Sequence, residues 1–272
     1  MTDVEELKQA LDYPWEKWTI FLHPAQRELV ERRYNGPARV AGSAGTGKTV
    51  VAIHRAVLLA RSHPNASVLF TTFSETLAAA LRVKLRLLVG HEPGVMERIS
   101  VLPFSDLARE LFADEFGEPM MVSKSDMKEI LSEAAASSES HRFSDHFVWS
   151  EWNEIVDAWQ LKSWDEYRDV PRLGRKTRLG ENQRRILWSI FERAMEELGR
   201  RNLLTESLQS RADPPFDYAV VDEAQDVGVP ELRFLAALGA EKQDCLFFAG
   251  DLGQRIFQPP FSWKSLGVDI RG

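Results

Sequence analysis

Gly42-Ser43-Ala44-Gly45-Thr46-Gly47-Lys48-Thr49 matches in full the pattern G-x-x-x-x-G-K-[ST], a loop that cradles phosphate groups. Its glycines let successive main-chain N–H groups point inward at a triphosphate, while Lys48 would reach the β- and γ-phosphates and the Thr49 hydroxyl would join the coordination of Mg²⁺. Residues 38–41 are typical of a short strand entering the loop, and residues 50–61 of a helix whose N-terminus faces the phosphates. We therefore expect a nucleotide site formed by every residue of this loop, rather than an ordinary glycine-rich turn.

The bulk composition is that of an ordinary soluble protein with one large domain or two smaller ones: 272 residues, 44% hydrophobic and 28% charged. A single cysteine, Cys245, excludes an intramolecular disulfide and fits a reducing cytosol. The sequence has neither an apolar run long enough to span a membrane nor the layout of a signal peptide, so we expect a cytoplasmic protein without membrane contact. The net charge of −7 argues against nonspecific attraction to nucleic acid by the whole molecule, but leaves room for a local basic groove.

Short apolar segments alternate with helical stretches, which predicts an α/β fold with a parallel sheet covered by helices on both faces. Right-handed crossovers would place the carboxyl ends of the strands along one edge, where ligands bind in open α/β sheets. The candidate strands are 38–41, 68–72, 99–102, 218–221 and 245–249.

The pattern changes between residues 107 and 210, where strand signals vanish and helical periodicity takes over. This predicts a helical subdomain at 107–210, inserted into a discontinuous α/β domain formed by 1–106 and 211–272. Trp152 and Trp159 lie seven residues apart on one helix face, which favours core packing over a stacking role for these tryptophans. The candidate helices are 125–135, 145–160, 164–169 and 181–200.

A pair of carboxylates, Asp222 and Glu223, directly follows the apolar segment 218–221. In proteins with a phosphate loop, an acid at such a strand end holds Mg²⁺, and a second acid can act as the base for an attacking water. Taken alone, such a pair is more often a solvated surface feature. In combination with the loop at 42–49, it predicts a metal ligand at Asp222 and a catalytic carboxylate at Glu223.

Two glutamines carry weaker signals. Gln254 lies in a polar turn after the apolar segment 245–249, where an amide could bond to the γ-phosphate or the attacking water; a simple capped turn is the alternative. Gln26 follows Pro24 at the start of a helix, and its amide suits the mixed donor and acceptor edge of adenine. An ordinary surface glutamine is the alternative reading of Gln26.

Taken in order, these segments resemble the superfamily 1 helicases of the UvrD/Rep/PcrA type. Residues 22–26 look like the Q motif, 42–49 like motif I, 71–74 like motif Ia, 222–226 like motif II in its D-E-x-Q-D form, and 250–254 like motif III. The resemblance implies a RecA-like fold, Mg-ATP hydrolysis and 3′→5′ movement on single-stranded DNA. It also implies catalytic roles for Lys48, Glu223 and Gln254.

Contacts to the DNA strand are likewise implied for Thr72, Phe73 and Ser74, by phosphate hydrogen bonds and base stacking. Core packing at a strand end is the alternative for Phe73. Arg172 and Arg175 belong to a basic cluster at 172–185 that could neutralise phosphates, although a solvated loop explains such a cluster equally well.

The sequence departs from the family after Asp251, where we find no counterpart of the later motifs that form the second RecA-like domain. We therefore expect an N-terminal piece of a longer polypeptide, whose partner is that second domain and which alone binds Mg-ATP but hydrolyses it very slowly. A nucleotide switch that never moves along DNA remains the first alternative. A small-molecule kinase is the second alternative. It fits poorly, because Glu223 is placed to activate an attacking water.

Overall fold

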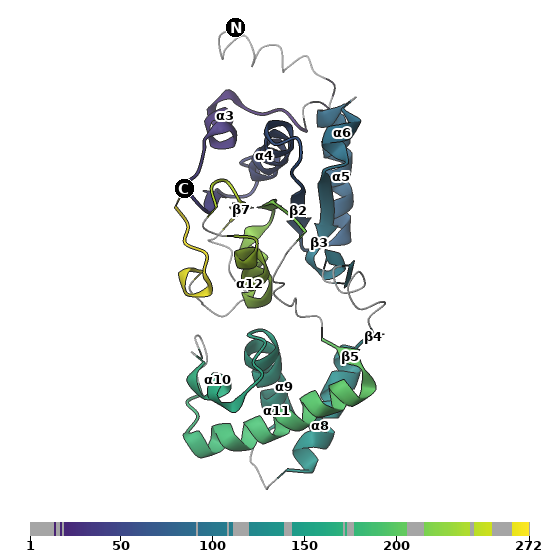
Figure 1. Ribbon diagram of the computed structural model, residues 1–272, viewed down its shortest axis with the longest axis vertical. Coiled ribbons are helices and arrows are strands. Elements are labelled where there is room, and N and C mark those ends of the chain that lie inside the picture. The colour runs from purple at the N-terminus through teal and green to yellow at the C-terminus, as the bar shows by residue number, and fades with distance from the viewer. Residues whose placement is uncertain are drawn as a thin grey trace.

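The computed structural model describes residues 14, 17, 19–90, 92–107, 109–110, 120–138, 143–170, 172, 177–205, 215–239, 242–251 and 263–271. Figure 1 shows a sheet with flanking helices at one end of the molecule and a group of helices at the other. The two parts are connected near the short strands β4 (Met120–Met121) and β5 (Leu203–Leu204). The mostly parallel sheet with helices confirms the predicted α/β class.

The sheet has five parallel strands in the order β1-β7-β6-β2-β3. The interior strand β2 is buried along its whole length, which explains why its sequence shows no alternation of apolar and polar residues. Strand order and direction place the carboxyl ends of β1, β6 and β7 at one edge of the sheet, as expected for a ligand edge. The strands are β1 (Ala38–Ala41), β2 (Val68–Thr72), β3 (Ile99–Pro103), β6 (Tyr218–Val221) and β7 (Leu246–Gly250).

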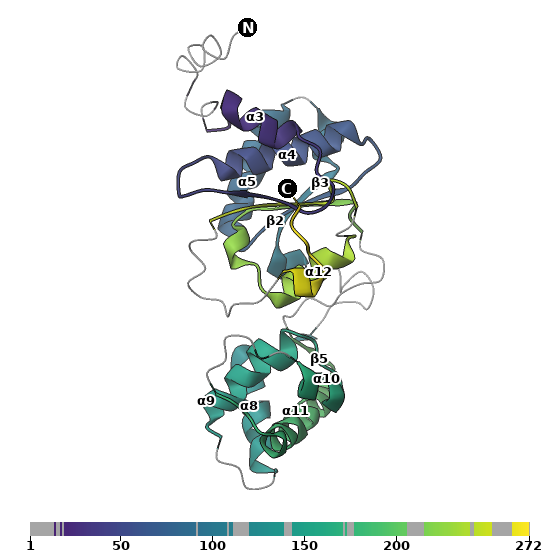
Figure 2. The same ribbon diagram turned by 90° about the vertical axis from the view of Figure 1, so that its left-hand side faces the viewer.

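Helices cover both faces of this sheet, as Figure 2 shows, with α3, α4 and α5 on one face and α12 on the other. Successive strand side chains point to opposite faces, so Phe70 joins a first core under α4 and α5, while Leu69 joins a second core under α12. The helices of this part are α3 (Pro24–Glu31), α4 (Lys48–Ser62), α5 (Glu75–Val89), α6 (Pro93–Met96) and α12 (Val229–Ala237), with 3₁₀ turns η2 (Ala224–Asp226) and η4 (Lys264–Leu266).

The remaining helices pack around a third core. Trp152 is 3% exposed, and its ring centroid lies 5.8 Å from that of Phe191. Trp159 packs half-buried against the same core, so both tryptophans serve packing. The elements are α8 (Lys124–Ala136), α9 (Asp145–Glu151), the π-helix η1 (Trp152–Asp157), α10 (Trp164–Asp169) and α11 (Glu181–Arg201).

Two local predictions for this region were wrong. The expected single helix at 145–160 becomes a π-helix at Trp152 and ends at Asp157, after which Gln160 adopts a left-handed backbone with φ 52°. The region also contains a parallel strand pair, in which Met120 and Met121 lie beside Leu203 and Leu204. A pair two residues long leaves no periodic pattern in a sequence. The π-helix buries Trp152, Ile155 and Val156, the same i, i+3, i+4 spacing that an α-helix would show.

Candidate nucleotide site

The loop between β1 and α4 curls back on itself through two glycines in the left-handed backbone region. Gly45 has φ 79° and Gly47 has φ 81°, values that side chains other than glycine rarely adopt. A Cβ on Gly47 would lie 2.7 Å from Gln26 Nε2, so this position also lacks room for a side chain. The helix begins immediately afterwards at Lys48, which directs its N-terminal N–H groups at the space above the loop.

Lys48 folds over this loop. Its ammonium group donates 2.8 Å hydrogen bonds to the main-chain oxygens of both Gly42 and Ser43. The loop carbonyls thus satisfy a half-buried cation that an anion above the loop could attract instead. The arrangement is therefore compatible with a phosphate site.

Asp222 lies at the end of β6, and its carboxylate meets the first turn of α4. The Thr49 hydroxyl donates to Asp222 Oδ2 at 2.9 Å, across 173 positions of sequence. Asp222 is 4% exposed. Burial raises the pKa of Asp222 to about 6, against the lowering effect of the Thr49 hydrogen bond. The loop and the acidic strand end predicted from the sequence are thus brought together.

These two groups suit a hard divalent cation. Mg²⁺ is usually held by one or two carboxylates or hydroxyls plus phosphate oxygens and water, and Thr49 with Asp222 supplies such a set. The carboxylate is buried, and its raised pKa shows that it lacks sufficient compensation for its charge. Among the described residues no group of three or more His, Cys, Asp and Glu forms a denser metal site.

Glu223, the second acid, has different surroundings. It is half-buried, and its backbone is left-handed with φ 56°, an uncommon conformation for a residue other than glycine. This bend starts the 3₁₀ turn η2 and separates the direction of Glu223 from that of Asp222. The Glu223 carboxylate accepts a hydrogen bond from Gln225 Nε2. Backbone strain of this kind gathers at functional sites, where surrounding structure sustains it.

Gln26 connects α3 to the loop. Its Nε2 donates to the main-chain oxygen of Thr46 at 2.8 Å, and its Oε1 accepts from the His23 N–H at 3.2 Å in a capping box. The same side chain therefore fixes the start of α3 and contacts the phosphate loop. Its expected contact with adenine stays a prediction.

The comparisons with known proteins agree with this geometry. A family model for the UvrD/REP helicase N-terminal domain matches residues 22–206. The chain belongs to this family. A search of curated proteins found no match. The matched range includes the phosphate loop and the helical region, but it ends before Asp222; the acid pair is joined to the site by the contact with Thr49.

For this UvrD/REP helicase domain, the family indicates a helicase-type motor that binds ATP and DNA. The residues expected to touch DNA next to the site lie at the end of β2 and just beyond it. Thr72, the last residue of β2, is fully buried, and its hydroxyl has no hydrogen-bond partner among the residues that the structure describes. Phe73 packs on Phe104, with ring centroids 5.1 Å apart. This contact favours core packing over base stacking for Phe73. Ser74 is exposed and caps α5 by accepting from the Leu77 N–H at 3.2 Å.

Arg172 makes an internal ion pair instead of forming part of a free basic surface. Its guanidinium donates to both carboxylate oxygens of Glu151, at 2.8 and 2.6 Å. The side chains are 6% and 0% exposed, respectively, and Tyr167 also donates to Glu151 at 3.0 Å. A buried and paired guanidinium argues against the expected phosphate contact in this conformation. Arg175 and Gln254 lie outside the described residues.

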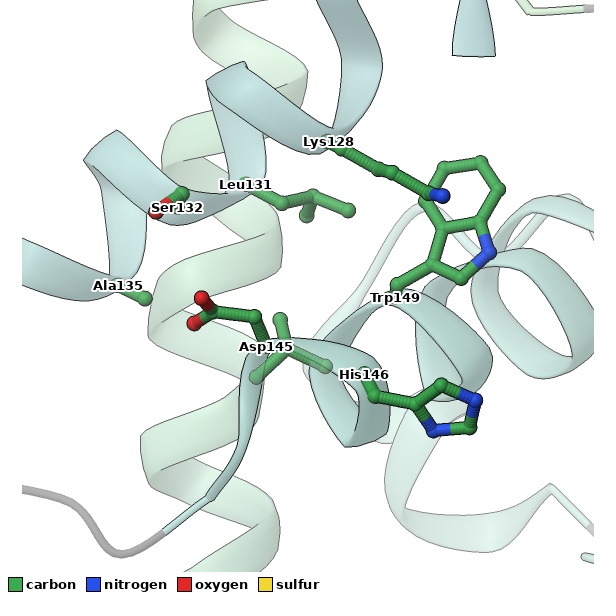
Figure 3. A pocket seen from close by; sticks show the side chains of 8 residues that line it. Lys128, Leu131, Ser132, Ala135, Asp145, His146 and Trp149 are labelled. Carbon is green, nitrogen blue, oxygen red and sulfur yellow. The ribbon is translucent and has the colours of Figure 1, made fainter. Parts of the chain in front are cut away.

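A hollow of about 340 Å³ in the helical part of the UvrD/REP helicase domain lies between α8 and α9 (Figure 3). The Lys128 ammonium covers the ring of Trp149, 5.2 Å from its centroid, so this possible stacking surface is already occupied.

Among the described helices, none is long and apolar enough to cross a membrane.

Two residues that border the acid pair were not singled out from the sequence. Gln225 is 8% exposed and bonds to Glu223, and Gly250 at the end of β7 lies against the same turn. Both belong to the motifs quoted for the family resemblance, and that membership was the only signal available.

Proposed function

We propose that this domain is the ATP-binding motor domain of an ATP-dependent 3′–5′ DNA helicase or translocase, which hydrolyses Mg-ATP to move on single-stranded DNA. The observation that carries the proposal is the contact between Thr49 and Asp222, because it joins the phosphate loop to an acidic strand end. Family membership supports the helicase class. We also propose a cytoplasmic location, and a division into a discontinuous RecA-like domain at 1–106 and 211–272 with a helical insertion at 107–210.

Each group of the site has a role in this proposal. The Lys48 ammonium leaves the carbonyls of Gly42 and Ser43 for the β- and γ-phosphates, where it offsets the charge of the transferred phosphoryl group. Thr49 and Asp222 would hold Mg²⁺, which would supply positive charge to neutralise the phosphates. Glu223 orients the attacking water and accepts its proton.

Two further groups would complete the nucleotide site. Gln26 would keep its contact with the loop at Thr46 while its amide meets adenine. Gln254 would bond to the γ-phosphate or to the attacking water. An arginine from a second RecA-like domain of the same polypeptide would stabilise the transition state, a contribution of about 10³–10⁵ in rate. Where such an arginine is absent, hydrolysis of bound Mg-ATP would be very slow.

Calorimetric titration with ATP tests the nucleotide site directly. The wild-type chain should bind ATP in a Mg²⁺-dependent manner, and Lys48→Ala should weaken binding by about tenfold or more, about 1.4 kcal/mol. Lys242→Ala is the matched control, because Lys242 is exposed and precedes β7 at the opposite edge of the sheet. A wild-type chain that takes up no ATP in the presence of Mg²⁺ would refute the proposed site.

A nucleotide switch without movement on DNA is the second candidate. It is favoured by the net charge of −7 and by the internal pairing of Arg172, which removes one of the expected phosphate contacts. In that case Ser74 and Arg175 would not contact DNA. Titration with a single-stranded oligonucleotide at several salt concentrations separates the two. Phosphate contacts predict an affinity that falls steeply with salt, whereas a switch predicts no binding.

A further inference from the structure

A buried amide connects the proposed catalytic carboxylate to a neighbouring strand. Gln225, in the turn η2, is 8% exposed. Its Nε2 donates to Glu223 Oε2, and its Oε1 accepts a 2.9 Å hydrogen bond from the main-chain N–H of Asp251. Asp251 directly follows β7, so one side chain links Glu223 to the end of another strand.

The amide of Gln225 suits both ends of this link. A carboxylate offers acceptors alone, and a main-chain N–H offers a donor alone. The bridging group must therefore donate at one end and accept at the other, and its O and N atoms can occupy just one orientation. Glutamate at position 225 would keep the bond from Asp251 but would place a second carboxylate against Glu223.

The strand end and the turn are also in close steric contact. A Cβ on Gly250 would lie 2.8 Å from the main-chain nitrogen of Ala224 and 2.8 Å from Gln225 Oε1. Side chains at position 250 are therefore excluded while Gln225 keeps its place. A displacement of the main chain at Gly250 or Asp251 must move Gln225, and the Glu223 carboxylate hydrogen-bonded to it must follow.

We propose that Gln225 is a positioning residue that aims the Glu223 carboxylate and couples its position to the main chain at the end of β7. The inference rests on the proposed role of Glu223 as the group that orients and deprotonates water. Gln225 acts through Glu223 and contributes nothing of its own to nucleotide affinity. Loss of the link leaves the Glu223 side chain free to rotate, and misplacement of a reacting group by about 1 Å can cost about 100-fold in rate.

Two substitutions in the full chain separate the two ends of the link, with Gln243→Glu as the control at an exposed position before β7. Gln225→Met removes both hydrogen bonds, and Gln225→Glu keeps only the bond from Asp251. We expect both to bind Mg-ATP within about threefold of wild type, and to reduce single-turnover hydrolysis by about 10- to 100-fold. The Asp251 amide, followed by NMR hydrogen exchange, should exchange at least about tenfold faster in Gln225→Met but not in Gln225→Glu.

A double variant identifies the route of the effect. If Gln225 acts through Glu223, then Gln225→Met causes no further loss of hydrolysis once Glu223→Gln is present, because the aimed group is already gone. A role in folding alone would instead add its own loss.

Four results would overturn the inference. They are additive losses in the double variant, normal hydrolysis in Gln225→Glu, unchanged Asp251 exchange in Gln225→Met, and a wild-type chain that binds ATP without measurable single turnover. Failure of the proposed function gives a different result, namely no Mg-dependent ATP binding by wild type, while the exchange experiment still tests the contact itself.

Discussion

Replacement of Asp222 by asparagine should stabilise the metal-free chain at neutral pH, although it should also destroy the proposed metal site. The Asp222 carboxylate is 4% exposed, and burial raises its pKa from 3.8 to about 6. One pKa unit corresponds to about 1.4 kcal/mol, so a rise of about two units corresponds to about 3 kcal/mol between the charged and neutral forms. Asparagine keeps an oxygen that can accept the Thr49 hydroxyl and carries no charge to desolvate.

The sign of the pH dependence follows from the direction of the shift. The folded chain binds the Asp222 proton more tightly than the unfolded chain does, so this group favours folding most below about pH 4. That contribution is lost as the pH rises through about 6. The free energy of unfolding of Asp222→Asn should therefore match wild type near pH 4 and exceed it by about 3 kcal/mol above pH 7.

Urea denaturation with EDTA, from pH 4 to pH 8, measures this difference. Asp165→Asn is a suitable control, because the Asp165 side chain is 75% exposed and should show little of the effect. Mg-ATP at 1,000 times its Kd should reverse the order, since it adds about 4.1 kcal/mol to wild type and little to the variant. Stability profiles of wild type and Asp222→Asn that stay parallel across this range would refute the buried, uncompensated carboxylate.

Three other substitutions test separate contacts. Glu223→Gln should keep Mg-ATP affinity and lose turnover in phosphate-release assays; normal turnover would remove Glu223 from the base role. Arg172→Ala should lower the free energy of unfolding by about 3–5 kcal/mol in urea, because it strands the buried Glu151 charge, and a loss below about 1 kcal/mol would contradict the pairing. Gly250→Ala should reproduce the hydrolysis defect of Gln225→Met, since its Cβ occupies the place of Gln225 Oε1, and unchanged hydrolysis would argue against that steric contact.

The sheet and the conformation of the loop at 42–49 could be predicted because their signals are local and strong. The segment Val68–Thr72 begins with three apolar residues and is buried throughout, since both faces of β2 are covered. In the loop at 42–49, Gly45 and Gly47 occupy positions where the backbone is left-handed. The residue types therefore indicate the loop conformation directly. The carboxyl ends of parallel strands share one edge of the sheet. This rule alone was enough to predict that Asp222 lies near Thr49, as the structure shows.

Long-range pairing explains what the sequence did not reveal. A cluster of arginines has the same sequence pattern whether its charges face solvent or a buried carboxylate. The partner of Arg172 is Glu151, 21 positions away at the end of α9. Gln225 depends on a main-chain group 26 positions away. Neither contact leaves a periodic pattern, because each joins one side chain to one distant group.

The site lies where the two cores of the sheet domain meet, and this position has a mechanical consequence. Thr49 precedes Val51, which belongs to the first core, while Glu223 precedes Ala224, which belongs to the second. Asp222 stands between them and contacts Thr49 across the edge of the sheet. A ligand held by both Thr49 and the acid pair would therefore tie α4 to the turn η2, and would oppose any separation of the two layers. Hydrogen exchange in both cores should then slow together when Mg-ATP binds, whereas protection confined to α4 would show that the acid pair takes no part in holding the nucleotide.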